Sequence, residues 1–254
     1  MTSGPELPSG PATAYIICST PRTGSTLLCR LLESTGVAGR PQSWFRAEDL
    51  GTWARRWGLP LSHGAPANFH DYVAAAIRAG RTDNNVFAAR IMWGSMDALV
   101  DGLAMPGTPT QAECLTVTFG PLRFVYIHRE DTVAQAVSWL RAEQSQVWHR
   151  LECAEAAPDS PSHYDFAALD TLVQTIRAHN SAWAQWFDAN DVQPLRLAYE
   201  ALDANPVATT QSLLDALGLV LPQGCTISAP NVRLADETSR EWAQRYRSDI
   251  AARS

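Results

Sequence analysis

Short apolar runs alternate with stretches of helical spacing along most of the chain. The apolar, β-prone runs that predict strands cover residues 15–18, 86–93, 124–128 and 195–199. Between them, apolar residues recur three and four positions apart, which predicts helices. The predicted helices begin near Leu27 and then cover residues 70–80, 96–103, 131–150, 166–187, 206–217 and 237–252. This alternation indicates an α/β fold with a parallel sheet covered by helices.

Several residues mark where the predicted helices begin and end. Asn205 followed by Pro206 is typical of a helix start, because Asn caps the first turn and Pro fits within it. Ser95 is placed to cap the helix that runs through residue 103. Gly80 and Gly218 follow apolar helical patterns and are predicted to end their helices.

Three stretches lack a clear period. Residues 40–70 are rich in aromatic side chains and are predicted to be irregular, serving as a substrate lid, a subunit contact or packing over the sheet edge. Residues 105–113 and 151–164 are predicted loops, since they contain Pro with small polar residues. Residues 1–13 are polar and rich in Pro and Gly, which predicts a flexible tail. No repeat or linker divides the rest, so residues 14–254 are expected to form one domain.

Composition narrows the class of protein. The 254 residues are 46% hydrophobic and 18% charged, values that are ordinary for a globular enzyme. The net charge is −6 and there is no Lys/Arg block, which argues against nucleic acid as a partner. No apolar stretch approaches the roughly 20 residues of a transmembrane helix, and the start lacks the pattern of a signal peptide.

The cysteines favour a cytoplasmic location. None of the five forms a CxxC pair or a metal-ligand spacing, and a scattered, odd set is typical of reduced thiols. Cys18 lies in a predicted strand and Cys29 in the following helix, so both are expected in the core. No metal site is expected.

The stretch from Tyr15 to Leu28, YIICSTPRTGSTLL, joins an apolar run to a helical pattern through a turn of small polar residues. Backbone N–H groups converge at such a junction, and the helix dipole adds about half a positive charge. Arg22 adds a full charge, and Ser25 and Thr26 add hydroxyl donors. The stretch therefore predicts an anion-binding loop, with an ordinary turn that binds nothing as the alternative.

The loop departs from the Walker A pattern, in which Gly is followed by Lys and then Ser or Thr. Ser25 occupies the Lys position after Gly24, and Ser19 stands where the first Gly would be. The cation is instead Arg22, two residues before Gly24. Such a loop suits a single 5′-phosphate, or a phosphate carrying one more small anion, better than a nucleoside triphosphate with magnesium.

Within this stretch, PRTGSTLL resembles the 5′-phosphosulfate loop of sulfotransferases that use 3′-phosphoadenosine 5′-phosphosulfate (PAPS). A second match is the run FVYIH, which is followed by Arg129 and, in the next helical stretch, by Ser138. In that family an Arg and a Ser at these places hold the 3′-phosphate. The order of the two matches along the chain agrees with the family.

Further segments are similar to one bacterial subfamily, the Stf0 type, whose members include trehalose sulfotransferase. They are TGVAGRPQ, HREDTVAQAVSW, the IMW after Arg90, and residues 233–249. The resemblance spans about residues 15–249 and implies a P-loop-like sulfotransferase fold with a central parallel sheet, and a homodimer. It assigns cofactor binding to Arg22, Thr23, Gly24, Ser25, Thr26, Arg129, Ser138 and Arg233.

Sulfuryl transfer needs a cation near the bridging oxygen, which gains negative charge, and a base near the attacking hydroxyl. Arg22 fits the first role by its position in the loop. Arg90 ends a predicted strand, where parallel sheets place their sites, and replaces a family Lys. We interpret Arg90 as a catalytic contact to substrate or sulfuryl group, with a structural ion pair as the alternative.

The base is where this chain departs from the resemblance. The trehalose-type members carry a catalytic Glu directly after the PQ dipeptide, and here that residue is Ser43. We predict Glu48 as the replacement, ahead of Asp49, His63 and His70 in the same aromatic segment. Two alternatives remain: an acceptor acidic enough to need little help, such as a phenol, or a loss of activity.

Together these features predict a sulfotransferase that moves a sulfuryl group from PAPS to a hydroxyl of a carbohydrate or glycolipid-type acceptor and releases 3′-phosphoadenosine 5′-phosphate (PAP). One alternative is a catalytically degenerate homologue that binds PAPS or PAP without turnover. The other is a P-loop-like small-molecule kinase, which the missing Walker Lys and the lack of a clear magnesium carboxylate disfavour.

Overall fold

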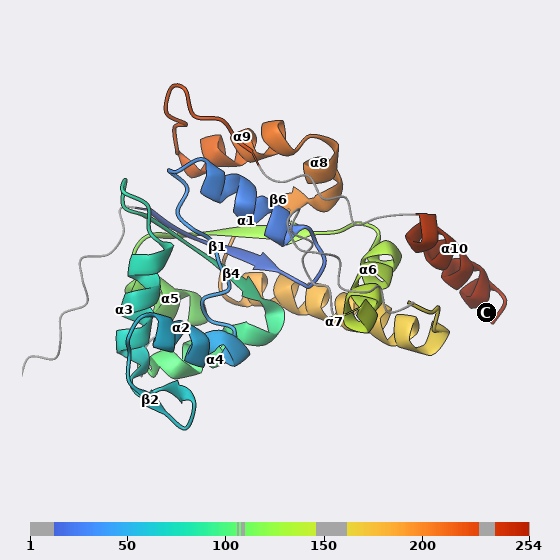
Figure 1. Cartoon of the computed structure of the whole chain (residues 1–254), viewed down its shortest axis with the longest axis horizontal. Coiled ribbons are helices and arrows are strands. Elements are labelled where there is room, and N and C mark those ends of the chain that lie inside the picture. Colours follow the sequence, from blue (N-terminus) through green and yellow to red (C-terminus); the bar gives the residue numbers. More distant parts are fainter. Residues whose placement is uncertain (1–12, 106, 108–109, 146–161, 229–236, 254) are drawn as a thin grey trace, which may run out of the picture.

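A four-stranded parallel sheet forms the centre of the computed structural model, which describes residues 13–105, 107, 110–145, 162–228 and 237–253 (Figure 1). The strands are β1 (Thr13–Ser19), β4 (Val86–Met92), β5 (Leu122–His128) and β6 (Leu195–Ala198), in the order β4-β1-β5-β6. Register pairs Ser19 with Met92, and Cys18 with Tyr126. The carboxyl ends of all four strands therefore meet at one edge.

One face of the sheet is covered by α1 (Ser25–Ser34), α8 (Tyr199–Ala204) and α9 (Pro206–Leu217) (Figure 1). Tyr15 and Ile17 of β1 point to this face, and their neighbours Ile16 and Cys18 point to the other. All four are fully buried. Because successive side chains of a strand alternate between faces, a continuous apolar run is what a strand buried on both sides requires.

The other face carries a larger aromatic core. It is covered by α2 (Leu50–Arg56), α3 (Phe69–Gly80), α4 (Met96–Leu103), α5 (Gln111–Phe119) and α7 (Phe166–Ala189). Trp183 of α7 is fully buried and donates its indole N–H to the carbonyl of Ser19 at 3.0 Å. This bond joins α7 to the last residue of the central strand, directly before the predicted anion loop.

A third cluster lies beyond the carboxyl ends of the strands. It joins α7 to α6 (Thr132–Ser145) and α10 (Glu237–Ala251), which lies at the far end of the molecule (Figure 1). Trp242 and Tyr246 are buried residues of α10 in this cluster. Arg247 of α10 pairs with Asp131, and its Nη2 lies 2.8 Å from each oxygen of that carboxylate.

The predicted α/β fold and its parallel sheet are confirmed, with small shifts in element ends. Asn205 caps α9 by accepting the N–H of Ala208 at 3.1 Å, and Gly218 ends that helix in the left-handed region. The strand predicted over residues 195–199 ends at Ala198, because Tyr199 already begins α8. Cys18 and Cys29 are buried, as expected.

Two stretches that were predicted to lack regular structure contain helices or strands. Residues 40–70 contain α2, the 3₁₀ turn η1 (Ala47–Asp49) and a two-residue hairpin of β2 (Leu61–Ser62) and β3 (Ala65–Pro66). The predicted loop 105–113 ends early because α5 begins at Gln111. Thr110 and Glu113 form a reciprocal capping box there. Ser95 stands at the start of α4 but makes no capping bond with its side chain.

Some expectations concern residues outside the described part. They are the tail at residues 1–12, the end of the helix predicted to reach residue 150, most of the loop 151–164, and Arg233. Among the described residues, no helix is both long and apolar enough to cross a bilayer.

Gly80 allows α3 to end close against β4. A Cβ placed on Gly80 would lie 2.7 Å from Cε2 of Phe87 and 2.9 Å from Nε1 of Trp44. We therefore expect Gly80→Ala to destabilise the fold by about 1–3 kcal/mol, as overpacking does. Gly94→Ala is the control, because a Cβ there meets no atom within 4 Å. Urea unfolding of both variants measures the difference, and equal midpoints would contradict this account of Gly80.

Candidate functional site

The loop between β1 and α1 turns through two residues with left-handed backbone. Arg22 has a φ of 66° and Gly24 a φ of 77°, so both lie in the left-handed region. A Cβ on Gly24 would come within 2.5 Å of Cδ2 of Tyr199, so a residue with a side chain would clash there. Thr23 and Ser25 are buried, and Thr23 donates its hydroxyl to the carbonyl of Thr20 at 3.1 Å. The turn is therefore tightly held.

Arg22 and Ser138, which the sequence assigns to different phosphate groups of the nucleotide, lie in direct contact. Nε of Arg22 donates to Oγ of Ser138 at 3.0 Å, across 116 positions of sequence. Ser138 lies on α6, which begins directly after β5 in the chain. The anion loop and the segment after β5 thus form one edge of the site.

Arg129 also lies at this edge of the site and packs against the ring of Tyr199. Its guanidinium carbon is 4.5 Å from the centroid of the Tyr199 ring, a cation–π contact. Its Nε is buried and has no hydrogen-bond partner in the described part of the chain. Burial, together with the charge of Arg129, lowers the pKa of Arg22 from its usual value. Two guanidinium groups that repel one another beside a donor without an acceptor form a local site for an anion.

Arg90 forms the second half of the site, on β4. Its Nε donates to Oγ of Ser43 at 3.0 Å and its Nη1 donates to Oγ1 of Thr26 at 2.8 Å. Thr26 is in the first turn of α1, directly after the anion loop. The half-buried guanidinium of Arg90 therefore links the loop helix to the segment that carries Ser43, through two neutral hydroxyls.

Ser43 is placed by a short extension of the sheet. Residues 39–42 run beside β4, where Gln42 forms a parallel bridge with Ala89. The N–H of Arg90 donates to the carbonyl of Gln42 at 2.9 Å, and the N–H of Arg40 donates to the carbonyl of Gly80 at 2.8 Å. These bonds bring Ser43 to the carboxyl edge together with Arg90.

The four residues predicted as candidate bases in place of Ser43 lie at the surface. Glu48 has a side chain that is 71% exposed, and its Oε2 lies 3.2 Å from Nε of Arg46. Asp49 shares Arg46, with an N···O distance of 3.6 Å. His63 and His70 are both exposed. Among the described contacts, none joins these four side chains to the cluster of Arg22, Arg90 and Arg129.

Two residues of the site were missed from the sequence. Tyr199, interpreted as the end of a strand, packs against Gly24 and Arg129. Gln135 is completely buried, and its Nε2 donates to Oγ1 of Thr20 at 2.9 Å and to the carbonyl of Pro21 at 2.6 Å. In the sequence, Gln135 could have been noticed as an amide side chain near the start of a helix that directly follows a strand.

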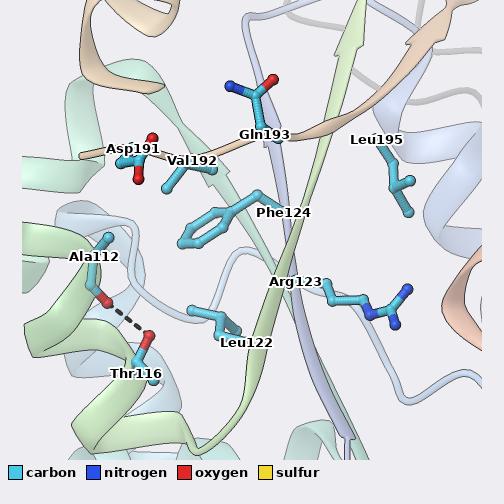
Figure 2. A pocket seen from close by; sticks show the side chains of 9 residues that line it. All are labelled: Ala112, Thr116, Leu122, Arg123, Phe124, Asp191, Val192, Gln193 and Leu195. Carbon is cyan, nitrogen blue, oxygen red and sulfur yellow. Dashed lines mark hydrogen bonds between the residues drawn. The ribbon is translucent and has the colours of Figure 1, made fainter. Parts of the chain in front are cut away.

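A hollow of about 370 Å³ lies at the opposite edge of the sheet (Figure 2). It is lined by Ala112, Thr116, Leu122, Arg123, Phe124, Asp191, Val192, Gln193 and Leu195. Figure 2 shows Phe124 and Arg123 on opposite sides of β5, and Arg123 donates to the carbonyl of Ala216 at 2.5 Å. The hollow lies at the amino ends of β5 and β6, so it is separate from the cluster of arginines at the carboxyl edge.

Comparison with known proteins agrees with this geometry. The family described as Stf0 sulphotransferase matches residues 14–249. Trehalose 2-sulfotransferase of Mycobacterium tuberculosis is 31% identical over 92% of this chain and 94% of its own. The enzyme of the same name from Mycolicibacterium smegmatis is 32% identical over 93% of this chain and 95% of its own.

A solved structure shares the fold. The sulfotransferase domain of the Synechococcus PCC 7002 olefin synthase superposes with a TM-score of 0.50 at 15% identity, covering 96% of this chain and 90% of that chain. At that identity the likeness shows the fold alone. The match to the family over nearly the whole chain, together with the two relatives, establishes that the chain belongs to the Stf0 sulphotransferase family.

Proposed function

We propose that this sulfotransferase takes its sulfuryl group from PAPS and transfers it to a hydroxyl of a carbohydrate or glycolipid-type acceptor, releasing PAP. The names of the two trehalose 2-sulfotransferases support an acceptor of the carbohydrate class. The observation that supports PAPS as the sulfuryl donor is the convergence of Arg22, Ser138 and Arg129 at the loop after β1. Location in the cytoplasm and a homodimer stay predictions from the sequence.

The residues fit the two phosphate groups of PAPS. The 3′-phosphate would be held by Arg129, whose buried Nε lacks an acceptor in the described part of the chain, and by Ser138. The 5′-phosphosulfate would be held by the loop from Arg22 to Thr26, where backbone N–H groups and hydroxyls meet the start of α1. Arg233, which lies outside the described residues, stays a predicted cofactor contact.

PAPS supplies an activated sulfuryl group, and the protein would have to stabilise the charge that moves with it. A fixed guanidinium at Arg22 would stabilise the negative charge that the bridging oxygen gains when the sulfuryl group leaves the phosphate. An Arg stays protonated near neutral pH, so Arg22 acts by charge and geometry and does not donate its proton. Arg90, fixed by Ser43 and Thr26, would orient the sulfuryl group or the acceptor beside it.

The attacking hydroxyl must also lose a proton. The hydroxyl of Ser43 accepts a hydrogen bond from Arg90 and is far too weak a base to take that proton. Glu48 is therefore retained as the proposed base, in the segment that follows Ser43. Its exposed ion pair with Arg46 means that it would have to leave Arg46 for the acceptor hydroxyl.

Nucleotide binding tests the proposed donor. Calorimetry should detect binding of PAP, and 5′-AMP should bind at least about thirtyfold more weakly, because it lacks the group that pairs with Arg129. Incubation with PAPS and trehalose, followed by mass spectrometry, then tests transfer. Preference for ATP with magnesium would favour the kinase alternative. Binding of PAP without transfer to any of a panel of sugars would favour the degenerate homologue.

Replacing Arg129 should selectively weaken PAP binding. We expect Arg129→Ala to cost about 2 kcal/mol or more in the binding free energy, which is typical of a charge-assisted hydrogen bond. Arg123→Ala is the matched control, since Arg123 lies near the start of β5, whereas Arg129 directly follows its end, and Arg123 contacts the carbonyl of Ala216. If PAP binds equally well to both variants, the assignment of Arg129 to the 3′-phosphate is wrong.

Replacing Glu48 tests the base. Glu48→Gln should leave PAP affinity unchanged and lower kcat by about a hundredfold or more, the usual contribution of a general base. Asp49→Asn is the matched control, because Asp49 contacts the same Arg46. Unchanged turnover in Glu48→Gln rules Glu48 out, and a loss confined to Asp49→Asn transfers the role to Asp49.

A further inference from the structure

Among the described contacts of α6, Gln135 is the side chain that places a buried amide against the anion loop. Both hydrogens of its Nε2 are used, one on Oγ1 of Thr20 and one on the carbonyl of Pro21. Its Oε1 is buried and has no hydrogen-bond partner in the described part of the chain. A buried carboxamide with one end unpaired costs stability, because water would have satisfied that oxygen in the unfolded chain.

The bond to Pro21 has a geometric consequence for the loop. The carbonyl of Pro21 belongs to the peptide group that also contains the N–H of Arg22. In a trans peptide the C=O and N–H point in opposite directions, so fixing this carbonyl toward α6 directs the N–H of Arg22 away from Gln135. Arg22 also holds a left-handed φ of 66°, which a residue other than Gly adopts at a cost. The loop conformation therefore needs an external restraint.

α6 supplies a second restraint one turn further along. Ser138, three residues after Gln135, accepts the hydrogen bond of the Arg22 side chain. One helix thus fixes the backbone before Arg22 through Gln135 and the side chain of Arg22 through Ser138. The start of α6 is itself fixed, because Asp131 caps it by accepting the N–H of Ala134 at 3.0 Å and pairs with Arg247 of α10.

We propose that Gln135 is a positioning residue for the anion loop, retained at a cost in stability because it sets the peptide group before Arg22 in the orientation that binds phosphate. This inference rests on the proposed function, since the phosphate would be that of PAPS. The proposal predicts that the order of the loop and the affinity for nucleotide change while the stability of the fold does not. A residue with a purely structural role would not show this combination. Removing the amide should loosen the loop and weaken nucleotide binding without destabilising the fold.

The test is Gln135→Met, which keeps the length of the side chain and removes its polar atoms. Without nucleotide, hydrogen exchange of the amides of residues 22–25 should become about tenfold faster, as expected for the loss of neutral hydrogen bonds. PAP affinity should fall by about the same factor. The thermal unfolding midpoint should stay about the same, because the loss of two hydrogen bonds is offset by the removal of an unpaired buried oxygen.

Gln144→Met is the matched control. Gln144 lies on the same helix, where its Nε2 donates to the carbonyl of His163 and its Oε1 accepts the N–H of His163, each at 3.0 Å. It should change neither exchange at residues 22–25 nor PAP affinity. Gln135→Leu is a second variant, which should loosen the same amides even if Met does not fit the space.

The outcomes separate the two proposals. If the wild-type protein does not bind PAP, the proposed donor is wrong, and exchange at residues 22–25 still decides the role of Gln135. Wild-type exchange in both Gln135 variants overturns the inference. So does faster exchange throughout the protein with a lower midpoint, because Gln135 would then be only a core residue.

Discussion

Repulsion between guanidinium groups at one edge of a parallel sheet is the constraint on which this structure depends. All four strands end at the same edge, so Arg22 and Arg129, which follow two neighbouring strands, are near enough for one to lower the pKa of the other. Arg90 adds a third cation from β4. The contacts described above join Arg22 and Arg90 to three hydroxyls and Arg129 to one aromatic ring. Three cations are thus gathered at one edge of a chain whose net charge is −6.

The rest of the scaffold holds this edge in place. Trp183 ties α7 to the end of β1, Gln135 ties α6 to the loop, and Tyr199 packs where only Gly24 leaves room. These contacts come from helices that are distant in sequence and lie on different layers of the fold. The loop after β1 is therefore held by side chains from three separate helices.

The sequence was sufficient to predict the parallel sheet, because its strands and helices have local patterns. The hydrogen bond between Arg22 and Ser138 was not predicted, since it joins residues 116 positions apart. A strand followed by small residues and a helix can be recognised without knowing its neighbours. It was less informative for α5, where β-branched residues in LTVTF resemble a strand although a Thr110–Glu113 capping box starts a helix. The roles of Tyr199 and Gln135 could not be predicted, since each depends on a contact across more than 100 residues. Glu48 was chosen by proximity in sequence, which does not determine how far a side chain lies from Arg90.

The short segment beside β4 also affects how the protein meets other chains. An exposed outer strand presents unpaired N–H and carbonyl groups that can recruit a strand from another molecule and start aggregation. Here Gln42 bridges to Ala89, and Arg81 bridges to Phe87, so part of the outer edge of β4 is already paired within the molecule. At the other edge, β6 is only four residues long and carries the exposed Arg196. The segment that brings Ser43 to the site thus also limits intermolecular growth of the sheet.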